Sequence, residues 1–166
     1  MKICKIEEQY IEYLRTKEPK VLINKEEKRP YIGVVLRITG YSYFIPLSSP
    51  KQKHRAMKNT KDFHKIAGGA YGAINFNKII PVPDKCIINF KFEDEEDESY
   101  KTLLQNQYKC IKEMKTVIIN KSNAIYSLFH SRDEDLSASD LRIKQRCCNF
   151  DLLEEMCRDY DKRGAD

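Results

Sequence analysis

The chain has 166 residues, 41% hydrophobic and 33% charged, with a formal net charge of +5. This length and composition fit one compact domain with its own core and argue against a disordered chain. No apolar run approaches the ~20 residues that cross a bilayer. The acidic Glu7 and Glu8 stand where a signal peptide would be apolar. We therefore expect a single cytoplasmic domain over residues 1–166, with no membrane partner.

The first half of the chain reads as β-structure. A short strand precedes a helix predicted over Glu8–Thr16. Tyr31–Ile38 is almost continuously apolar and β-branched, as in a buried strand, and Thr39-Gly40 is a turn signal before Tyr41–Leu47. We expect a β-hairpin here, with Pro46 at a strand end or edge because proline cannot donate to a ladder.

Two further strands are predicted over Tyr71–Val82 and Cys86–Phe92, which alternates well. Short antiparallel strands at this spacing favour a small barrel or a strongly curled sheet. Residues 1–92 are thus expected to be the β-rich half.

Residues 93–166 read as helices. The acidic run Glu93–Glu98 leads into Ser99, which we predict as a helix N-cap. Helical spacing then continues to Ile118, and Asn120–Asn123 is expected to interrupt it before His130. A last helix should begin near Ser137 or Ser139, with Gly164 just past its end. The order of strands followed by helices predicts an α+β fold and argues against a βαβ nucleotide fold.

The distribution of charge and the spacing of the cysteines indicate which macromolecules, metals and cofactors the chain could bind. Residues 1–92 hold 18 Lys and Arg against 8 Asp and Glu, a balance of +10, whereas residues 93–166 hold 12 against 17. The basic half indicates a polyanionic partner, although a generic solvated surface has a similar composition. The six cysteines form no C-x-x-C pair, so we expect buried, reduced thiols, no metal and no other cofactor.

The densest polar segment follows the predicted hairpin, over Leu47–Arg55. It holds the hydroxyls of Ser48 and Ser49 together with Lys51 and His54. Hydroxyls and lysines bind phosphate oxygens, lysine offsets charge in a transition state, and histidine moves protons near pH 7. Further residues could hold an RNA backbone, namely Arg29, Lys53, Arg55, Lys58, Lys61, His64 and Lys65. The plainer alternative is an ordinary solvated loop, which composition alone favours.

A metal route is poorer, because no spaced carboxylate pair stands beside this segment and the run 93–98 is more typical of a solvated linker. Without a metal, the substrate's own 2′-hydroxyl is the nearest nucleophile, and RNA has it while DNA does not. The expected products are a 2′,3′-cyclic phosphate and a 5′-hydroxyl. The glycine-rich Ala67–Gly72 lacks the lysine and hydroxyl of a phosphate-binding loop, so we interpret it as a flexible turn.

Two runs carry a family resemblance: Lys28-Arg-Pro-Tyr-Ile-Gly-Val-Val-Leu36 and Tyr43-Phe-Ile-Pro-Leu-Ser-Ser-Pro-Lys-Gln-Lys-His54. They resemble the type III toxin–antitoxin endoribonucleases, the ToxN and AbiQ family, and the resemblance covers essentially the whole chain. It implies a compact curled β-barrel like that of the MazF and Kid toxins, elaborated with helices. It also implies metal-independent cleavage of cellular or phage mRNA, leading to growth arrest or phage defence. The implied partner is a small structured RNA antitoxin, cut from a repeat array by the toxin and closing a toxin–RNA complex that blocks the active site.

Within that resemblance, Ser49 matches the family's key hydroxyl, Ser48 a neighbouring Thr or Ser, and Lys51 the catalytic lysine. Tyr31 stands where the family has an aromatic residue near the site, and His54 closes the motif. Tyr10, on the first predicted helix, is a further carry-over, as an RNA contact. Two other readings stay open. One is a basic module that binds RNA without cutting it, and the other is a protein-interaction domain, which would leave the basic half unexplained.

Overall fold

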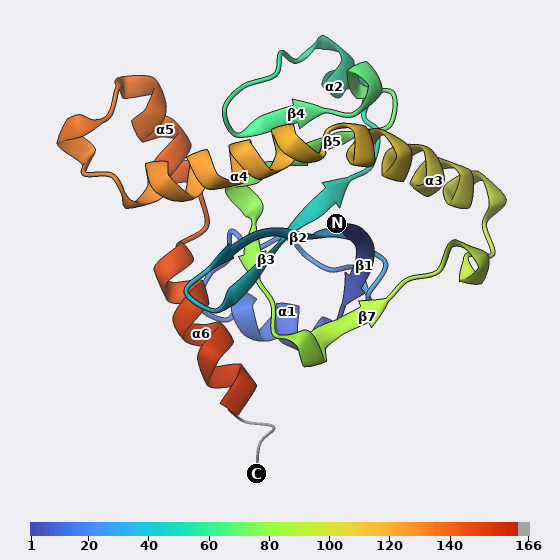
Figure 1. The fold of residues 1–166 in the computed structure, drawn as a ribbon, viewed down its shortest axis with the longest axis horizontal. Coiled ribbons are helices and arrows are strands. Elements are labelled where there is room, and N and C mark those ends of the chain that lie inside the picture. Colours follow the sequence, from blue (N-terminus) through green and yellow to red (C-terminus); the bar gives the residue numbers. More distant parts are fainter. Residues whose placement is uncertain (163–166) are drawn as a thin grey trace.

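The computed structural model describes residues 1–162, so the position predicted for Gly164 lies outside the described residues. A central antiparallel sheet is built from the first half of the chain, and most of the helices come from the second half (Figure 1). The α+β order is therefore confirmed. Within residues 1–162, no helix is both long and apolar enough to span a bilayer.

The sheet has seven strands, all paired antiparallel. They are β1 (Lys2–Ile6), β2 (Tyr31–Ile38), β3 (Tyr41–Ser48), β4 (Phe63–Lys65), β5 (Ala73–Asn75), β6 (Ile80–Pro81) and β7 (Ile87–Asn89). Their order is β4-β5-β3-β2-β1-β7, with β6 also paired to β3. The end strands β4 and β7 do not pair with each other, so the sheet is open and the expected barrel does not close.

The sheet fails to close because its outer strands are short. The strand predicted over Tyr71–Val82 is interrupted by a 3₁₀ turn at Phe76–Lys78, which leaves only β5 and β6. The strand predicted over Cys86–Phe92 is reduced to β7 between 3₁₀ turns at Asp84–Cys86 and Phe92–Asp94. The likeness to the MazF and Kid toxins stays a prediction from the resemblance.

The hairpin of β2 and β3 is confirmed, with positive φ angles at Thr39 and Gly40 in its turn. Pro46, however, lies within a strand that has partners on both sides. Leu47 N donates to Pro30 O on the β2 side at 2.9 Å, so the neighbouring Pro46 nitrogen faces the other side. There the partner of β3 changes from β6 at Phe44 to β5 at Leu47, and no ladder donor is required between them.

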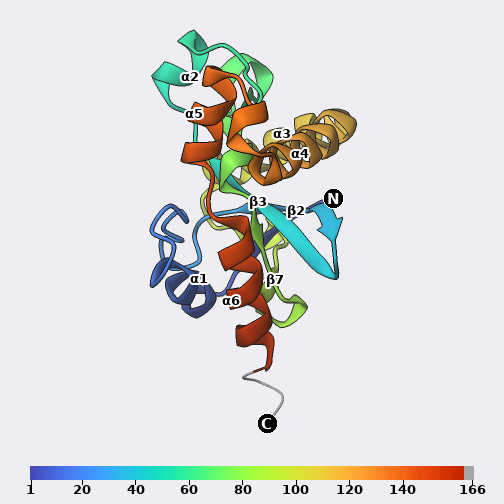
Figure 2. The ribbon, with the colours of Figure 1, turned by 90° about the vertical axis from the view of Figure 1, so that its left-hand side faces the viewer.

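Within the described part of the chain, six α-helices pack around the sheet, and Figure 2 shows α1 and α6 together on the side away from α3 and α4. Their bounds are α1 (Glu8–Arg15), α2 (Gln52–Ala56), α3 (Glu98–Glu113), α4 (Lys115–His130), α5 (Ala138–Arg146) and α6 (Phe150–Lys162). Asp97 caps α3 by accepting from Tyr100 N, so the predicted N-cap at Ser99 is wrong by two residues. The acidic run supplies the cap itself, one position before the first helical residue.

The predicted interruption at Asn120–Asn123 is also wrong, because α4 continues through it and the break lies at Met114. Ser122 Oγ and Asn123 Nδ2 each donate to the carbonyl four residues earlier, which lets polar residues remain inside a helix. The predicted last helix is in fact α5 and α6. Ser137 caps α5 as expected, and the chain turns at Cys147–Asn149.

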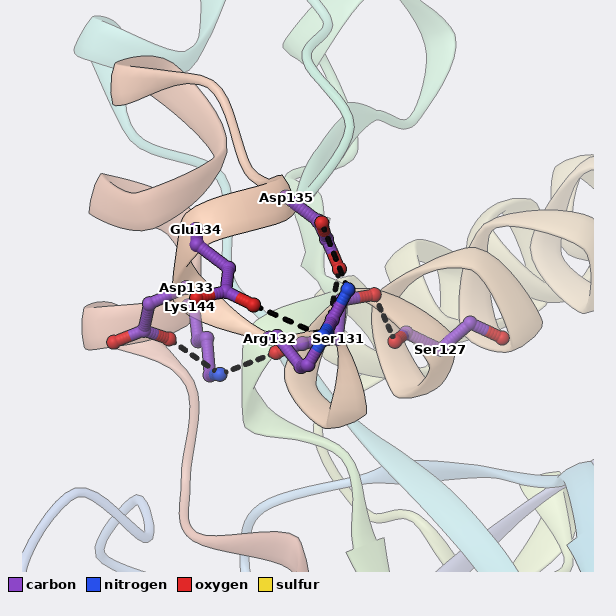
Figure 3. Close-up of polar contacts among 7 residues, drawn as sticks. All are labelled: Ser127, Ser131, Arg132, Asp133, Glu134, Asp135 and Lys144. Atoms are coloured by element: carbon purple, nitrogen blue, oxygen red, sulfur yellow. Dashed lines mark hydrogen bonds and ion pairs between the residues drawn. The ribbon is translucent and has the colours of Figure 1, made fainter.

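The link between α4 and α5 is held by its own charges (Figure 3). Arg132 pairs with Glu134 at 2.9 Å and with Asp135 at 2.9 Å. Lys144 on α5 pairs with Asp133 at 2.7 Å and donates to Ser131 O at 2.7 Å. The acidic side chains of this turn are therefore compensated by cations next to them.

The core between the sheet and the helices is apolar, and five of the six free cysteines are buried in it, while Cys110 is partly buried. One carboxylate joins three elements at its edge. Glu154 Oε1 on α6 accepts from Tyr43 Oη of β3 at 2.5 Å and from Tyr126 Oη of α4 at 2.8 Å. Tyr43 is fully buried, and burial followed by the Glu154 contact raises the pKa of its hydroxyl.

We expect Tyr43→Phe to lower the free energy of unfolding by about 1.5–3 kcal/mol, the usual effect of losing a hydrogen bond to a charged group. Urea denaturation measures the change. Tyr108→Phe is the matched control, since the half-buried Tyr108 hydroxyl makes no hydrogen bond to residues 1–162, and it should change stability by less than about 0.5 kcal/mol. Equal effects of the two variants would contradict the role given to Glu154.

Candidate active site

The predicted reactive segment begins at the end of β3 and turns into α2. Ser48 is the last residue of the strand, pairs with Ala73 of β5, and its Oγ accepts from Asn75 Nδ2 at 3.1 Å. Ser49 and Lys51 follow it, are exposed, and make no side-chain hydrogen bond to the other described residues. The end of β3 thus leads into the exposed hydroxyl of Ser49 and the exposed ammonium of Lys51, while Asn75 holds the hydroxyl of Ser48.

The backbone of the glycine-rich segment packs directly against the backbone of these residues. Its prediction as a flexible turn did not include this contact. Gly72 has φ +94° and passes so near the end of β3 that a Cβ would collide with Ser48 O and lie 3.2 Å from Ser49 C. Gly69 has φ +98°, and a Cβ there would lie 2.8 Å from His54 C. Only glycine combines this conformation with this approach. The segment therefore contacts the candidate site on both sides of Lys51.

Helices of the second half hold the same segment. Gln107 on α3 is buried and donates through Nε2 to Tyr71 O at 2.6 Å, one residue before Gly72. Lys121 on α4 donates through Nζ to the carbonyls of Thr60 and Phe63. Asp62 is buried and accepts from Arg146, just before the turn after α5, at 3.0 Å. The glycine-rich segment is thus attached to α3, and the loop that carries the basic residues is attached to α4 and α5.

His54 lies on α2, where its backbone N donates to Lys51 O at 2.9 Å. Its ring is buried, packs at 5.9 Å from the Phe63 ring, and leaves Nδ1 without a partner among residues 1–162. Burial, followed by the charges of Lys51 and Lys53, lowers the pKa of His54 below its usual 6.5. The imidazole beside Lys51 is therefore neutral at pH 7.

Two tyrosines predicted at the site are buried in the core. Tyr10 is 0% exposed and donates to Pro81 O at 2.6 Å, so its side chain faces the core, and its contact with RNA stays a prediction. Tyr31 is 1% exposed, at the start of β2, and pairs with Pro46. Burial raises the pKa of its hydroxyl, which has no partner among residues 1–162. Both rings therefore pack in the core, and a role of Tyr31 near the substrate likewise stays a prediction.

The predicted basic residues divide into two groups. Lys53, Arg55 and Lys58 are exposed, and their side chains pair with no carboxylate of the described residues. The others are engaged. Lys61 pairs with Asp140 at 2.6 Å, Lys65 Nζ donates to Arg55 O at 3.3 Å, His64 is half-buried in β4, and Arg29 donates to Ile23 O and Leu47 O. The free positive charge is therefore gathered on and just after α2.

Two hollows adjoin the site. The Ser49 hollow, of about 560 Å³, is lined by Ser49 and Leu47, by Lys25, Lys28 and Arg29, and by residues 94–97 with Tyr100. The Lys51 hollow, of about 390 Å³, is lined by Pro50, Lys51, Gln52, Arg55, Gly69 and Ala70. Two neighbouring residues of the motif, Ser49 and Lys51, thus line two separate concave surfaces.

Sequence reasoning missed several supports of the site. Asn75 and Gly72 act through the pairing of β3 with β5, which could not be read because Tyr71–Val82 looked like one continuous strand. Gln107 lies in a helical pattern in which a buried glutamine is indistinguishable from a surface one. The only available sign was the pair of glycines itself.

Gly72→Ala should destabilise the fold by about 1–3 kcal/mol more than Gly68→Ala, because overpacking against backbone cannot be relieved by a rotamer change. Gly68 also has a positive φ, but a Cβ there meets nothing within 4 Å, so it controls for backbone strain. The free energy of unfolding in urea measures both. Equal losses would show that the end of β3 can move away from residue 72.

The lowered pKa values of His54 and His64 predict a pH dependence of stability. Below pH 6.5 the unfolded chain binds protons that the folded chain does not, so stability should fall as the pH drops from about 6.5 through the folded-state pKa values. Unfolding free energies at pH 7.5 and 5.5 test this, in a window above the usual carboxylate range. His54→Gln should flatten the slope, and an unchanged slope in that variant would argue against its burial.

Comparison with known proteins places the chain in a family. The family profile described as "Toxin ToxN, type III toxin-antitoxin system" matches residues 2–158. The chain is 33% identical to "Endoribonuclease ToxN" of Bacillus thuringiensis subsp. kurstaki, over 95% of this chain and 83% of that protein. It is 31% identical to "Endoribonuclease AbiQ" of Lactococcus lactis subsp. lactis, over 96% and 89%.

Solved structures give the same result. One, described as a study of selective toxin inhibition by a non-coding RNA pseudoknot, matches with a TM-score of 0.84 at 31% identity, covering 96% of each chain. Another, of AbiQ, described as a lactococcal anti-phage endoribonuclease, matches with a TM-score of 0.78 at 28% identity, covering 97% of this chain and 98% of that one. The chain therefore belongs to the ToxN toxin family of type III toxin–antitoxin systems.

Proposed function

We propose that this protein is a metal-independent endoribonuclease that cuts RNA by attack of a ribose 2′-hydroxyl on the adjacent phosphorus. The 2′-oxygen–phosphorus bond forms and the bond to the 5′-oxygen breaks, leaving a 2′,3′-cyclic phosphate and a 5′-hydroxyl. The proposal depends on one observation: Ser49 and Lys51 are exposed, form no side-chain hydrogen bond to the other described residues, and follow a strand end that Asn75 supports. Its context is a family whose curated relatives are named endoribonucleases.

In this mechanism, Ser49 donates a hydrogen bond to a non-bridging oxygen of the scissile phosphate and positions it for attack. Lys51 places its ammonium against the charge that accumulates on the pentavalent phosphorus. Ser48 acts as a positioning residue, because Asn75 already holds its hydroxyl. The backbone supports at Gly69 and Gly72 keep the two reactive groups at a fixed separation, as transition-state stabilisation requires.

A proton must leave the 2′-hydroxyl and another must reach the 5′-oxygen. Of the two candidates from the sequence, His54 is the better one, because it lies beside Lys51 and is neutral at pH 7, as a general base has to be. Both rings are buried, but the raised pKa of the Tyr31 hydroxyl keeps it protonated at pH 7, so it is the poorer base. We therefore assign proton transfer to His54, which takes the proton of the 2′-hydroxyl and, as the imidazolium so formed, gives it to the leaving 5′-oxygen, and we assign core packing to Tyr31.

The unpaired cations Lys53, Arg55 and Lys58 would hold the substrate backbone on either side of the cut. We propose cellular or phage mRNA as the substrate and exclude DNA, which lacks the attacking hydroxyl. Such transcripts place the activity in the cytoplasm. The described anti-phage activity of AbiQ supports a role in phage defence.

We further propose a small structured RNA as the inhibitor, cut from a repeat precursor by this protein and bound over the active site. Two solved relatives support this proposal. They are described in terms of toxin inhibition by a non-coding RNA pseudoknot and of a processed non-coding RNA that regulates an antiviral system. The exposed basic surface around α2 has the charge that such a partner needs.

Purified protein should cut mixed RNA in excess chelator, and Lys51→Ala or Ser49→Ala should slow cleavage by about 100-fold or more. Single-turnover rates on a labelled RNA measure the loss. Direct labelling of the new 5′ ends by a kinase, without prior phosphatase treatment, identifies the 5′-hydroxyl.

Lys58→Ala is the matched control, because Lys58 is exposed and unpaired but lies outside the Ser48–Lys51 motif, and it should slow cleavage by less than about 5-fold. RNA left intact by the unmodified protein would overturn the catalytic proposal. Salt-sensitive binding without product ends would instead identify an RNA-binding module.

A further inference from the structure

The Ser49 hollow carries opposite charges on two of its walls. Lys25, Lys28 and Arg29 line one side, and the segment 94–97 lines another together with Tyr100. No carboxylate of this segment forms an ion pair with a lysine or arginine within the described part of the chain. On the cationic side, Lys28 pairs with Glu26 at 3.3 Å, and both of these side chains are exposed. Cations that face carboxylates without an ion pair across the hollow suit a ligand that has both an anionic end and hydrogen-bond donors.

The contrast with the other acidic run of this chain is direct. Asp133, Glu134 and Asp135 are each paired with Arg132 or Lys144 in their own turn (Figure 3). Residues 94–97 are instead held by backbone contacts: Asp97 N donates to Glu95 Oε1 at 3.3 Å, and Tyr100 N donates to Asp97 Oδ1 at 3.0 Å. These bonds fix the segment and leave the second oxygen of each carboxylate free.

The cationic wall is fixed as well. Lys25, Glu26 and Glu27 all have positive φ, and this unusual turn is held because Glu27 N donates to Glu8 Oε2 at 2.9 Å while Glu8 N donates to Glu27 Oε1 at 3.2 Å. Arg29 donates to Leu47 O at 3.2 Å, two residues before Ser49. Hydrogen bonds within the protein therefore hold both charged segments that line the hollow. The segment that contains Arg29 is also bonded to β3, which ends just before Ser49.

We propose that the Ser49 hollow binds the nucleotide next to the cut bond, with Lys28 and Arg29 on its phosphate and Glu95 accepting from the amino group of its base. The inference rests on the proposed function and adds a determinant of base preference to it. The hollow, at about 560 Å³, lies within the range of about 300–1,000 Å³ that small-ligand sites occupy. Glu95 is the one carboxylate of the segment that is half-buried rather than exposed, which strengthens its hydrogen bonds.

The chemistry of the bases gives the direction of the preference. Adenine, cytosine and guanine carry an exocyclic amino group, which a carboxylate accepts from. Uracil has none, and its single ring N–H lies between two carbonyl oxygens that a carboxylate repels. The hollow should therefore disfavour uracil at one position beside the cut.

The test is cleavage of an RNA pool randomised on both sides of a cut site, with product ends read by sequencing. The unmodified protein should disfavour uracil at one flanking position, and Glu95→Gln should reduce that discrimination by about tenfold. Glutamine keeps an oxygen for Asp97 N, so the segment retains its support. The comparison uses the ratio between bases, because the variant also removes a negative charge and will raise affinity for every RNA.

Glu93→Gln is the matched control, since it removes the same charge from a residue outside the hollow, and it should leave the base profile unchanged. Cleavage by Glu95→Gln with the profile of the unmodified protein would overturn this inference and leave the proposed function standing. If Glu93→Gln changed the base profile as much as Glu95→Gln does, the effect would be one of general charge, and the inference would be overturned too. Absence of cleavage by the unmodified protein would overturn both proposals.

Discussion

Where Gly72 passes the end of β3, two backbones approach each other more closely than any side chain would permit. This contact fixes where the strand stops and where the segment with Ser49 and Lys51 begins. It occurs at the place where β3 exchanges β6 for β5, and Pro46 occupies the point at which no ladder donor is needed. Ser49 and Lys51, the candidate reactive residues, thus follow a strand end that main-chain packing positions.

The helical half completes the support of this site. Gln107 bonds to the residue before Gly72, Lys121 bonds to the carbonyls of the basic loop, and Arg146 pairs with Asp62 inside that loop. Because each of these contacts comes from a different helix, the orientation of α2 depends on the packing of the whole second half. The division of the chain into a basic sheet and an acidic helical half therefore describes its charge, whereas the candidate site draws on both.

Local patterns in the sequence were sufficient for the β2–β3 hairpin and for α1, because alternation and turn residues are properties of neighbouring residues. A dense polar string, likewise a local pattern, identified the candidate segment. They failed where long-range contacts decide. The 3₁₀ turn at Phe76–Lys78 breaks an apparently continuous strand, and back-bonding by Ser122 and Asn123 keeps a helix intact. Burial of Tyr10 and Tyr31 likewise depends on tertiary packing, which the spacing of residues does not reveal.

The attachment of the basic loop to α4 and to Arg146 also has a consequence for the order in which the protein is made. A ribosome releases residues 46–54 well before residues 107–146, so the complete motif emerges while its supports are still unsynthesised. During that interval the nascent chain contains Ser49 and Lys51 without the contacts that Gln107, Lys121 and Arg146 later supply. The candidate site is thus assembled only after α3, α4 and α5 have been synthesised, so the order of synthesis separates the appearance of the motif from the formation of its supports.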